Sequence, residues 1–266
     1  MMVAVRLLVL IVGFVLSWFL LSQVDWMDRL SIEELSQDSQ DKLSEFIKEQ
    51  IERSEEVIKD KDIIKTIDSL VQIIVSANAI DGEDVKVIVV NNQEVNAFAL
   101  PKAYMVINSG LIAACKSPEA LSGVIAHELS HIQLKHVERK LLKELGVAVL
   151  LSSTAGGGAE VMKQVIKTLS GTAYDRSLEQ EADESAVRYL INAQIDPEPL
   201  ASFFYDLSLG EPEFVSKLSW VSTHDDSKER AEAIIEIISK KEYGKRPMLG
   251  KGTWSDLQEN IQQLNK

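Results

Sequence analysis

Cysteine, histidine and positive charge are all scarce in this sequence of 266 residues. Cys115 is the only cysteine, so no intrachain disulfide can form and a cysteine-rich zinc or iron–sulfur site is excluded. The chain has 28 basic and 41 acidic residues, a formal net charge of −13. This balance argues against a nucleic-acid partner, because such proteins need clustered Lys and Arg. Because cysteine is so scarce, any metal must be bound by His, Asp or Glu.

Hydrophobic residues make up 45% of the chain, which is enough to form a core and is not typical of a disordered tail. The sequence contains only four histidines: His127, His131, His136 and His224. Because histidine is so rare here, the clustering of the first three is informative.

The N-terminal segment Leu7–Val24 is a nearly continuous apolar stretch without a charge. At about 1.5 Å per residue it spans about 27 Å, close to the thickness of a bilayer core. Arg6 precedes the segment and Asp25 follows it, so the positive-inside rule places the N-terminus in the cytoplasm. We expect residues 1–26 to be an uncleaved transmembrane signal anchor, with the rest of the chain extracytoplasmic or periplasmic. A cleaved signal peptide is the alternative, but no A-x-A-like cleavage site follows the segment.

Beyond this segment, the hydrophobic pattern predicts a mainly α protein with a small β-sheet, an α+β fold. The predicted helices cover residues 32–57, 63–75, 111–115, 117–145, 172–193, 199–209 and 228–240. The predicted strands cover residues 85–90, 97–100 and 104–107. We expect a helical N-terminal part at residues 27–80, a core at 81–244 and a weakly patterned C-terminal tail at 245–266.

The segment Gly146–Ala159 is apolar and rich in glycine, and it is too short to span a membrane alone. It is typical of a buried or mobile loop and helix. A membrane-facing patch is the alternative.

Residues 127–131 read HELSH, which matches the HExxH pattern inside a predicted helix. His127 and His131 are four residues apart and lie about 40° from each other around the helix, so both imidazoles can bind one zinc ion. Glu128 is rotated by about 100° and can reach a water on the zinc, whose pKa zinc lowers to about 7. A solvated helix face is the alternative. The small, apolar residues 122–126 favour a buried helix, where such a cluster would be costly without a metal.

A catalytic zinc needs a third protein ligand. Cys115 lies in an apolar stretch before the motif and is a poor candidate, and His136 lies about 140° around the helix from the second motif histidine, so we expect a surface or capping role for it. Glu179 and Asp183 are four apart on a second predicted helix and share a face. One of these carboxylates can bind zinc while the other accepts the second N–H of a ligand histidine. Glu181 lies about 200° from Glu179 and is expected to face solvent.

The HExxH motif followed by this acidic run resembles metallopeptidase family forty-eight, a family of membrane-associated gluzincins. Further segments resemble the family's other motifs in the same order: the strand pair Asn96–Pro101 and Met105–Ile112, the segment Arg176–Asp183, and Ser222–His224 with Arg230. The resemblance covers about residues 85–235 and implies a zincin-like metalloprotease domain behind one transmembrane helix, with a zinc metallopeptidase core at residues 81–244.

The resemblance implies a role for each matching residue. His127, His131 and Glu179 would bind one Zn²⁺ per chain, Glu128 would be the general base, and Asp183 would bond to a ligand histidine.

Later and earlier segments would complete the site. His224 and Arg230 would approach the metal as catalytic residues, where a histidine can cap the open zinc position or stabilise the oxyanion and an arginine can order the acidic groups. Asn96, Ala97 and Phe98 would lie on an edge strand that binds the substrate backbone by β-augmentation.

The sequence departs from the family pattern in two places. Lys102 and Ala103 replace the usual Gly-Gly after the proline, and Asp225 replaces the proline after His224. We therefore expect differences in the hairpin and in the loop that positions His224, but not in the metal site.

Together these features predict a zinc-dependent endopeptidase that acts on protein or peptide substrates at a membrane, and the resemblance implies a role in protein quality control. A latent protease, blocked by His224 or by Gly146–Ala159 until a partner binds, is compatible with this function. A chaperone or binding module that keeps zinc for structure is the other alternative, and Glu128 argues against it because a non-catalytic site needs no base.

Overall fold

The computed structural model describes residue 6 and residues 37–80, 85–154, 159–209, 220–224 and 227–264. The fold below is that of the compact unit Gln37–Lys266. The expected membrane anchor at residues 7–24 lies outside the described residues. Among the helices that are described, none has both the length and the apolar character that crossing a membrane requires.

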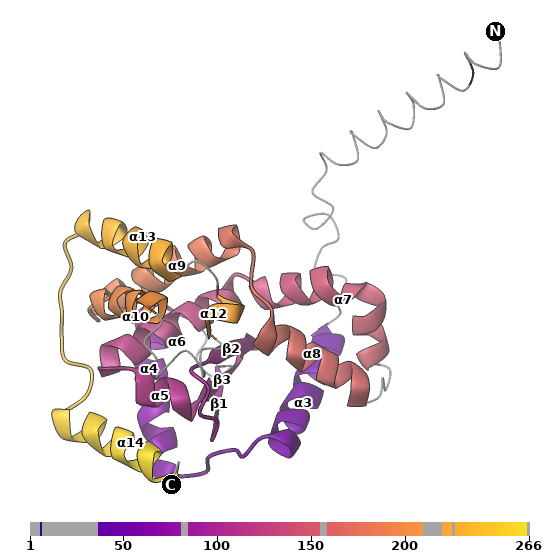
Figure 1. Ribbon diagram of the computed structural model, residues 1–266, viewed down its shortest axis with the longest axis horizontal. Helices are drawn as coiled ribbons and strands as arrows, with labels where there is room; N and C mark the ends of the chain where they lie inside the picture. The colour runs from indigo at the N-terminus through magenta and orange to yellow at the C-terminus, as the bar shows by residue number, and fades with distance from the viewer. Residues whose placement is uncertain are drawn as a thin grey trace. The chain divides into compact units, whose positions relative to one another are not determined.

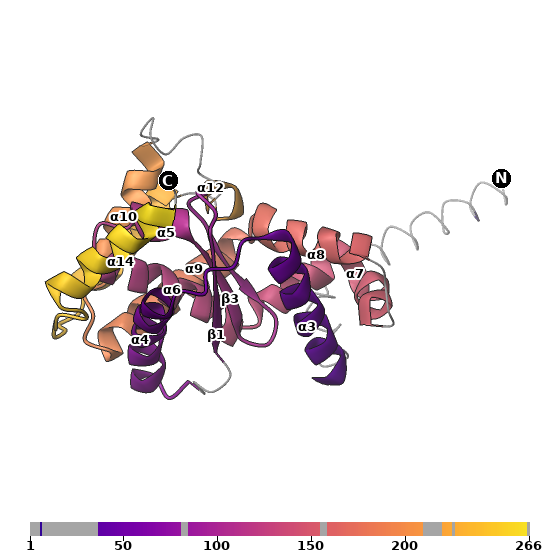
Figure 2. The ribbon, with the colours of Figure 1, turned by 90° about the horizontal axis from the view of Figure 1, so that it is seen from below.

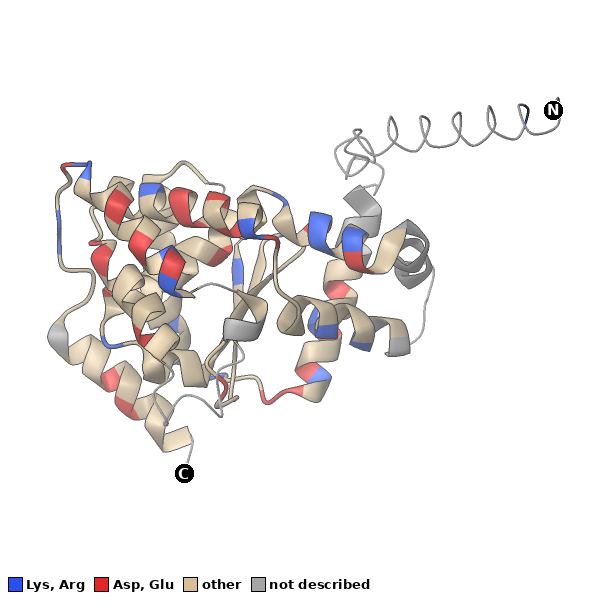
Figure 3. Ribbon diagram, turned by 45° about the horizontal axis from the view of Figure 1, so that its top comes forward, with Lys and Arg blue, Asp and Glu red and all other residues tan. Residues whose placement is uncertain are grey.

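The described part of the chain is mainly helical, as the sequence predicts. The helices are α3 (Gln37–Ser54), α4 (Lys61–Ala77), α5 (Ser109–Ala114), α6 (Pro118–Gln133), α7 (His136–Thr154), α8 (Ala159–Gly171), α9 (Arg176–Asn192), α10 (Glu198–Leu209), α12 (Trp220–Thr223), α13 (Ser227–Ser239) and α14 (Lys251–Leu264). Figures 1 and 2 show α4 and α6 on one side of a small sheet and α3 and α8 on the other. Figure 3 shows acidic and basic residues interspersed along the outer helices.

The sheet has three strands, β1 (Lys86–Val90), β2 (Ala97–Leu100) and β3 (Tyr104–Asn108), in the order β1-β3-β2. β1 runs parallel to β3, and β2 runs antiparallel to β3, with which it forms a hairpin. Every residue of β2 and β3 is buried. The sequence therefore predicted all three strands, and β2 lies at an edge of the sheet.

The β2–β3 hairpin turns through Lys102 and Ala103, the two residues that replace Gly-Gly of the family pattern. Both have positive φ, 59° and 58°, in the left-handed region that glycine adopts more easily. The turn thus keeps the backbone conformation that glycine favours, although neither residue is glycine.

Helix α6 begins with a strong cap and ends abruptly. The Ser117 hydroxyl accepts a hydrogen bond from the Ala120 amide, and Pro118 occupies the first turn. The helix ends before Leu134, and Lys135 has a φ of 57°. The prediction of one continuous helix over residues 117–145 was therefore wrong: the chain forms two helices, α6 and α7, because a left-handed residue separates them.

Helix α6 is buried along most of its length and packs against α4, α9 and α10. At Gly123 it lies very close to α10. A Cβ atom built at this position would lie 2.6 Å from the Cβ of Leu200 in α10. The absence of a side chain at Gly123 thus sets how closely α10 approaches the helix that carries the HExxH motif.

The C-terminal residues, whose sequence pattern is weak, form helix α14. Leu257 and Ile261 are buried against the core, and the Gln258 side-chain amide donates hydrogen bonds to the carbonyls of Ile112 and Cys115. Two buried apolar residues four apart are too short a pattern to predict a helix from sequence.

We predict that Gly123→Ala destabilises the protein by about 1–3 kcal/mol, because the new methyl overpacks the contact with Leu200. Alanine also gains about 1 kcal/mol of helix propensity, and this gain does not exceed the cost of overpacking. Chemical unfolding measures the difference. Gly252→Ala is the matched control, since no atom lies within 4 Å of a Cβ there. A Gly123→Ala variant at least as stable as the control would contradict the packing argument.

Candidate metal centre

Four buried side chains from three parts of the fold converge on one point. His127 and His131 come from α6, Glu179 from α9, and His224 follows α12. Each offers one ligand atom, and these atoms all lie within 4.8 Å of one another. The structure thus brings together the three ligands expected from the sequence and adds His224 to them.

The ring nitrogens of the two motif histidines face each other. The Nε2 atoms of His127 and His131 lie 3.0 Å apart, and they lie 3.5 and 3.4 Å from carboxylate oxygens of Glu179. Tetrahedral zinc with bonds of about 2.0–2.1 Å places its ligand atoms about 3.3 Å apart. Nitrogen and carboxylate donors at these separations fit a zinc ion.

The protonation of two of these rings suits metal binding, and that of the third opposes it. Burial lowers the pKa of His131 well below its ordinary value and that of His224 to about 4, although Glu179 opposes both shifts. Burial also lowers the pKa of His127, but its hydrogen bonds to Asp183 and Glu179 outweigh burial and raise it to about 9. A proton therefore leaves His127 when a metal binds.

His224 occupies a position between the ligands and the motif glutamate. Its Nδ1 lies 2.9 Å from Glu179 Oε1 and 3.3 Å from His127 Nε2, while its Nε2 lies 3.4 Å from Glu128 Oε1. The indole of Trp220 stacks on its ring at 4.1 Å. Asp225, the second departure from the family pattern, lies outside the described residues.

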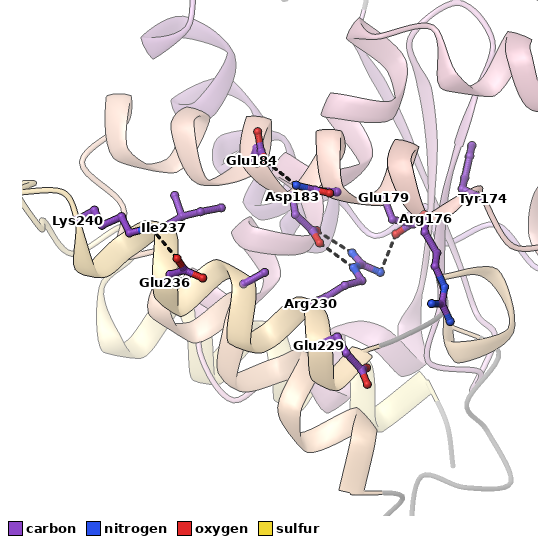
Figure 4. A pocket seen from close by; sticks show the side chains of 12 residues that line it. Tyr174, Arg176, Glu179, Asp183, Glu184, Glu229, Arg230, Glu236, Ile237 and Lys240 are labelled. Carbon is purple, nitrogen blue, oxygen red and sulfur yellow. Dashed lines mark hydrogen bonds and ion pairs between the residues drawn. The ribbon is translucent and has the colours of Figure 1, made fainter. Parts of the chain in front are cut away.

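A buried arginine links the two carboxylates of α9. Arg230 in α13 contacts both oxygens of Asp183 and Oε2 of Glu179, each at 2.7 Å (Figure 4). Asp183 Oδ1 in turn accepts from His127 Nδ1 at 3.0 Å. Burial raises the pKa of each carboxyl, but the cationic neighbours outweigh it, and the pKa of both stays below its ordinary value. Arg230 therefore keeps the two acids ionised inside the protein.

Glu128 lies beside the ligands but is not one of them. Neither carboxylate oxygen has a hydrogen-bond partner within the described parts of the chain, and the residue is fully buried. Burial raises the pKa of Glu128 to about 7, although the charge of His127 and the backbone amide of Ala99 lower it. Glu128 is thus an ionisable group that titrates near neutral pH, with oxygens available for a ligand.

His136 is buried and contacts the site, so its predicted surface position was wrong. Its Nδ1 lies 3.0 Å from His131 Nδ1, and its Nε2 lies 3.2 Å from a carboxylate oxygen of Glu181. The break before α7 turns the chain, so an angle calculated for a continuous helix does not apply. The Glu181 side chain is 51% exposed, in agreement with its predicted position towards solvent.

Besides Trp220, sequence reasoning missed two further residues at the site. Tyr174 stacks on His131 at 4.0 Å, and its backbone amide donates to the Thr223 carbonyl. The ammonium of Lys140 lies 3.9 Å from the centre of the Tyr174 ring and donates to the Thr172 carbonyl, while burial lowers its pKa to about 8. Neither residue belongs to a motif, and only the fold brings them to the site.

The residues expected on the substrate-binding strand are buried. Asn96, Ala97 and Phe98 are 2%, 0% and 9% exposed. The Asn96 amide donates to the Ser170 carbonyl, and its oxygen accepts from Thr223. The following residue, Ala99, is the one whose amide acts on Glu128, so this edge strand passes beside the site.

A cavity lies on the other side of the acidic pair, between α9 and α13. Tyr174, Arg176, Glu179, Asp183 and Arg230 line it together with residues further along both helices (Figure 4). The cavity therefore reaches Glu179, one of the four clustered residues, and its contacts with Arg230.

We predict that Arg230→Met destabilises the metal-free protein by about 3–5 kcal/mol, because it leaves two buried carboxylates without their cation. Chemical unfolding of the metal-free protein at neutral pH measures the loss. Lys240→Met, directly after the same helix, removes an exposed partner of Glu236 and is expected to change stability very little. Equal stability of the two variants would show that Arg230 does not compensate the buried charges.

Comparisons with known proteins agree with this geometry. Mitochondrial metalloendopeptidase OMA1 of Arabidopsis thaliana is 30% identical over 161 residues, which are 59% of this chain and 32% of the relative. OMA1 of Bos taurus is 27% identical over 168 residues, which are 56% of this chain and 32% of the relative. The beta-barrel assembly-enhancing protease of Escherichia coli K12 is 27% identical over 182 residues, covering 62% and 37%. The chain therefore spans about a third of the length of these relatives.

The model of peptidase family M48 matches residues 59–238. This match covers more than half of the chain and includes every residue of the metal centre, and the chain therefore belongs to peptidase family M48.

Proposed function

We propose that this chain is a zinc-dependent endopeptidase that hydrolyses peptide bonds of protein substrates. The observation that carries the proposal is the position of Glu128, a buried carboxylate with a pKa near 7 beside a cluster of metal-ligand atoms. A buried acid without a hydrogen-bond partner among the described residues is costly to keep, and such groups concentrate at functional sites.

In this proposal His127, His131 and Glu179 bind the metal. Zinc bound there would supply Lewis acidity at the scissile carbonyl and at water. Glu128 takes a proton from the attacking water and delivers it to the leaving amine, a role suited to a carboxylate that titrates near neutral pH. Asp183 accepts the Nδ1–H of His127 and so fixes the tautomer that leaves Nε2 free.

His224 and Arg230 complete the proposed machinery. His224 Nε2, 3.4 Å from Glu128 Oε1, is placed to donate a hydrogen bond near the developing oxyanion. Arg230 keeps Glu179 ionised and in place for the metal. Asn96 and the first two residues of edge strand β2, Ala97 and Phe98, would present their backbone to an extended substrate.

We further propose that the enzyme acts at a membrane in protein quality control. The uncharged segment Leu7–Val24 supports a single anchor, with the catalytic part on the extracytoplasmic side. Relatives named for mitochondria and for β-barrel assembly support a substrate at or near a membrane.

We predict that Glu128→Gln lowers casein cleavage by about 10²–10⁴-fold, because the amide cannot accept a proton. The zinc content per chain should stay that of the parent. Elemental analysis and cleavage assays on the full chain check both parts. Chelation should abolish cleavage by the parent, and added zinc should restore it.

Glu119→Gln, in the first turn of the same helix, is the control and should cleave like the parent. Zinc in parent and Glu128→Gln with no cleavage by either would instead favour a latent protease or a zinc-holding binding module. Absence of metal from both would refute the ligand assignment.

A latent protease is the second candidate function, and one observation favours it. Four protein ligand atoms from His127, His131, Glu179 and His224 can fill a tetrahedral site, whereas a catalytic zinc keeps one position open. In this form His224 blocks the position that water and substrate need.

We predict that His224→Ala raises cleavage of a short peptide if the enzyme is latent, because it opens that position. Initial rates at saturating zinc give the measurement, with the double variant His224→Ala/Glu128→Gln as the inactive control. Cleavage by the parent that His224→Ala leaves unchanged or lowers would count against latency and favour the role of His224 at the oxyanion.

A further inference from the structure

His131 is connected to the protein surface through two further side chains. Its Nδ1 contacts His136 Nδ1 at 3.0 Å, and His136 Nε2 contacts Glu181 Oε2 at 3.2 Å. The first two rings are fully buried, whereas the Glu181 side chain is 51% exposed. This row runs from the metal ligands outward through α7 and ends on α9, on the face opposite to Glu179.

The direction of the hydrogen bonds in this row follows from the proposed metal site, on which the inference rests. His131 Nε2 faces the other ligands and must be free of a proton to bind a metal, so the ring carries its proton on Nδ1. That N–H donates to His136 Nδ1, which must then be the unprotonated nitrogen of its own ring. His136 Nε2–H is left to donate to the Glu181 carboxylate.

The Nδ1 atoms of the two motif histidines therefore have different hydrogen-bond partners. His127 donates directly to Asp183, a buried carboxylate that Arg230 holds. His131 donates to a neutral imidazole, which is itself held by a carboxylate at the surface. Its ring is further confined by Tyr174, which stacks on it at 4.0 Å.

The break between α6 and α7 produces this arrangement. Lys135 takes a left-handed conformation, and its amide donates to the Ile132 carbonyl. This turn changes the direction of the chain so that His136, five residues after His131, approaches the same ring. A continuous helix would separate the two side chains by about 140°.

We propose that His136, held by Glu181, is a positioning residue that fixes the orientation and tautomer of His131 for metal binding. The hydrogen bond from His131 leaves one ring nitrogen directed at the metal, and Glu181 prevents His136 from rotating away. A surface carboxylate thereby contributes to the affinity of a buried metal site.

The affinity of the metal-free full chain for zinc, measured by competition with a chromophoric chelator, tests the proposal. We expect His136→Phe, which keeps a ring but removes the acceptor, to weaken zinc binding about 10–100-fold. His136→Asn places an amide oxygen near the former Nδ1 and should recover most of the loss. Glu181→Ala should weaken binding less than His136→Phe, and Glu184→Gln, an exposed change one turn from Glu181, should not alter it.

Two results overturn the proposal: zinc binding by His136→Phe as tight as by the parent, or binding by His136→Asn no tighter than by His136→Phe. Glu181→Ala indistinguishable from Glu184→Gln overturns the part assigned to Glu181.

A second measurement needs no substitution and so does not depend on a variant that folds. The ¹⁵N chemical shifts of the ring nitrogens in the zinc-loaded parent identify the tautomer of each histidine. We expect the proton of His136 on Nε2, and a proton on Nδ1 would overturn the proposal.

Failure of the proposed function gives a different result. A parent chain that binds no zinc refutes the metal site itself. A parent that binds zinc and loses cleavage with Glu128→Gln, but whose His136 variants bind zinc as the parent does, refutes only the positioning role.

Discussion

The buried ion pairs of Arg230 are the constraint on which the rest of this structure depends. Glu179 and Asp183 carry two negative charges into the interior, where an uncompensated charge is very costly. The guanidinium contacts both, and the ring of Phe204 covers it at 4.2 Å. Because the arginine lies on α13 and the acids on α9, the fold must hold these two helices together for the ligands to remain ionised. The metal centre is thus inseparable from helix packing at the C-terminal side of the domain.

The sequence predicted the centre of this site better than its surroundings. Helical spacing alone placed His127 and His131 on one face of α6, and Glu179 and Asp183 on one face of α9. It succeeded because both pairs lie inside uninterrupted helices. It failed for His136, since the left-handed residue between α6 and α7 changes the direction of the chain. Trp220 and Tyr174 were missed for another reason. They meet the histidine rings through tertiary packing, which leaves no periodic signal in the sequence.

The same distinction holds for the fold. The three strands, the start of α6 and helix α9 were predicted because each has a regular apolar pattern or clear breaking residues, such as Pro118 at the start of α6. Helix α14 was not, because its contact with the core depends on two apolar residues and on hydrogen bonds from Gln258 to carbonyls far away in sequence. Local apolar patterns predict individual helices and strands, whereas contacts like those of Gln258 form only in the assembled core.

The ligand residues also differ in how firmly the fold holds them, and this bears on the choice between an open and a closed metal site. His127, His131 and Glu179 lie on α6 and α9, two long helices packed closely together. His224 follows the four-residue helix α12, whose backbone bonds to Val95 and Tyr174 and whose Trp220 is buried in the core. Moving that short segment displaces one core side chain and breaks these bonds, whereas moving any other ligand displaces a long helix of the core. If one ligand leaves to admit substrate, the structure makes His224 the least costly to move.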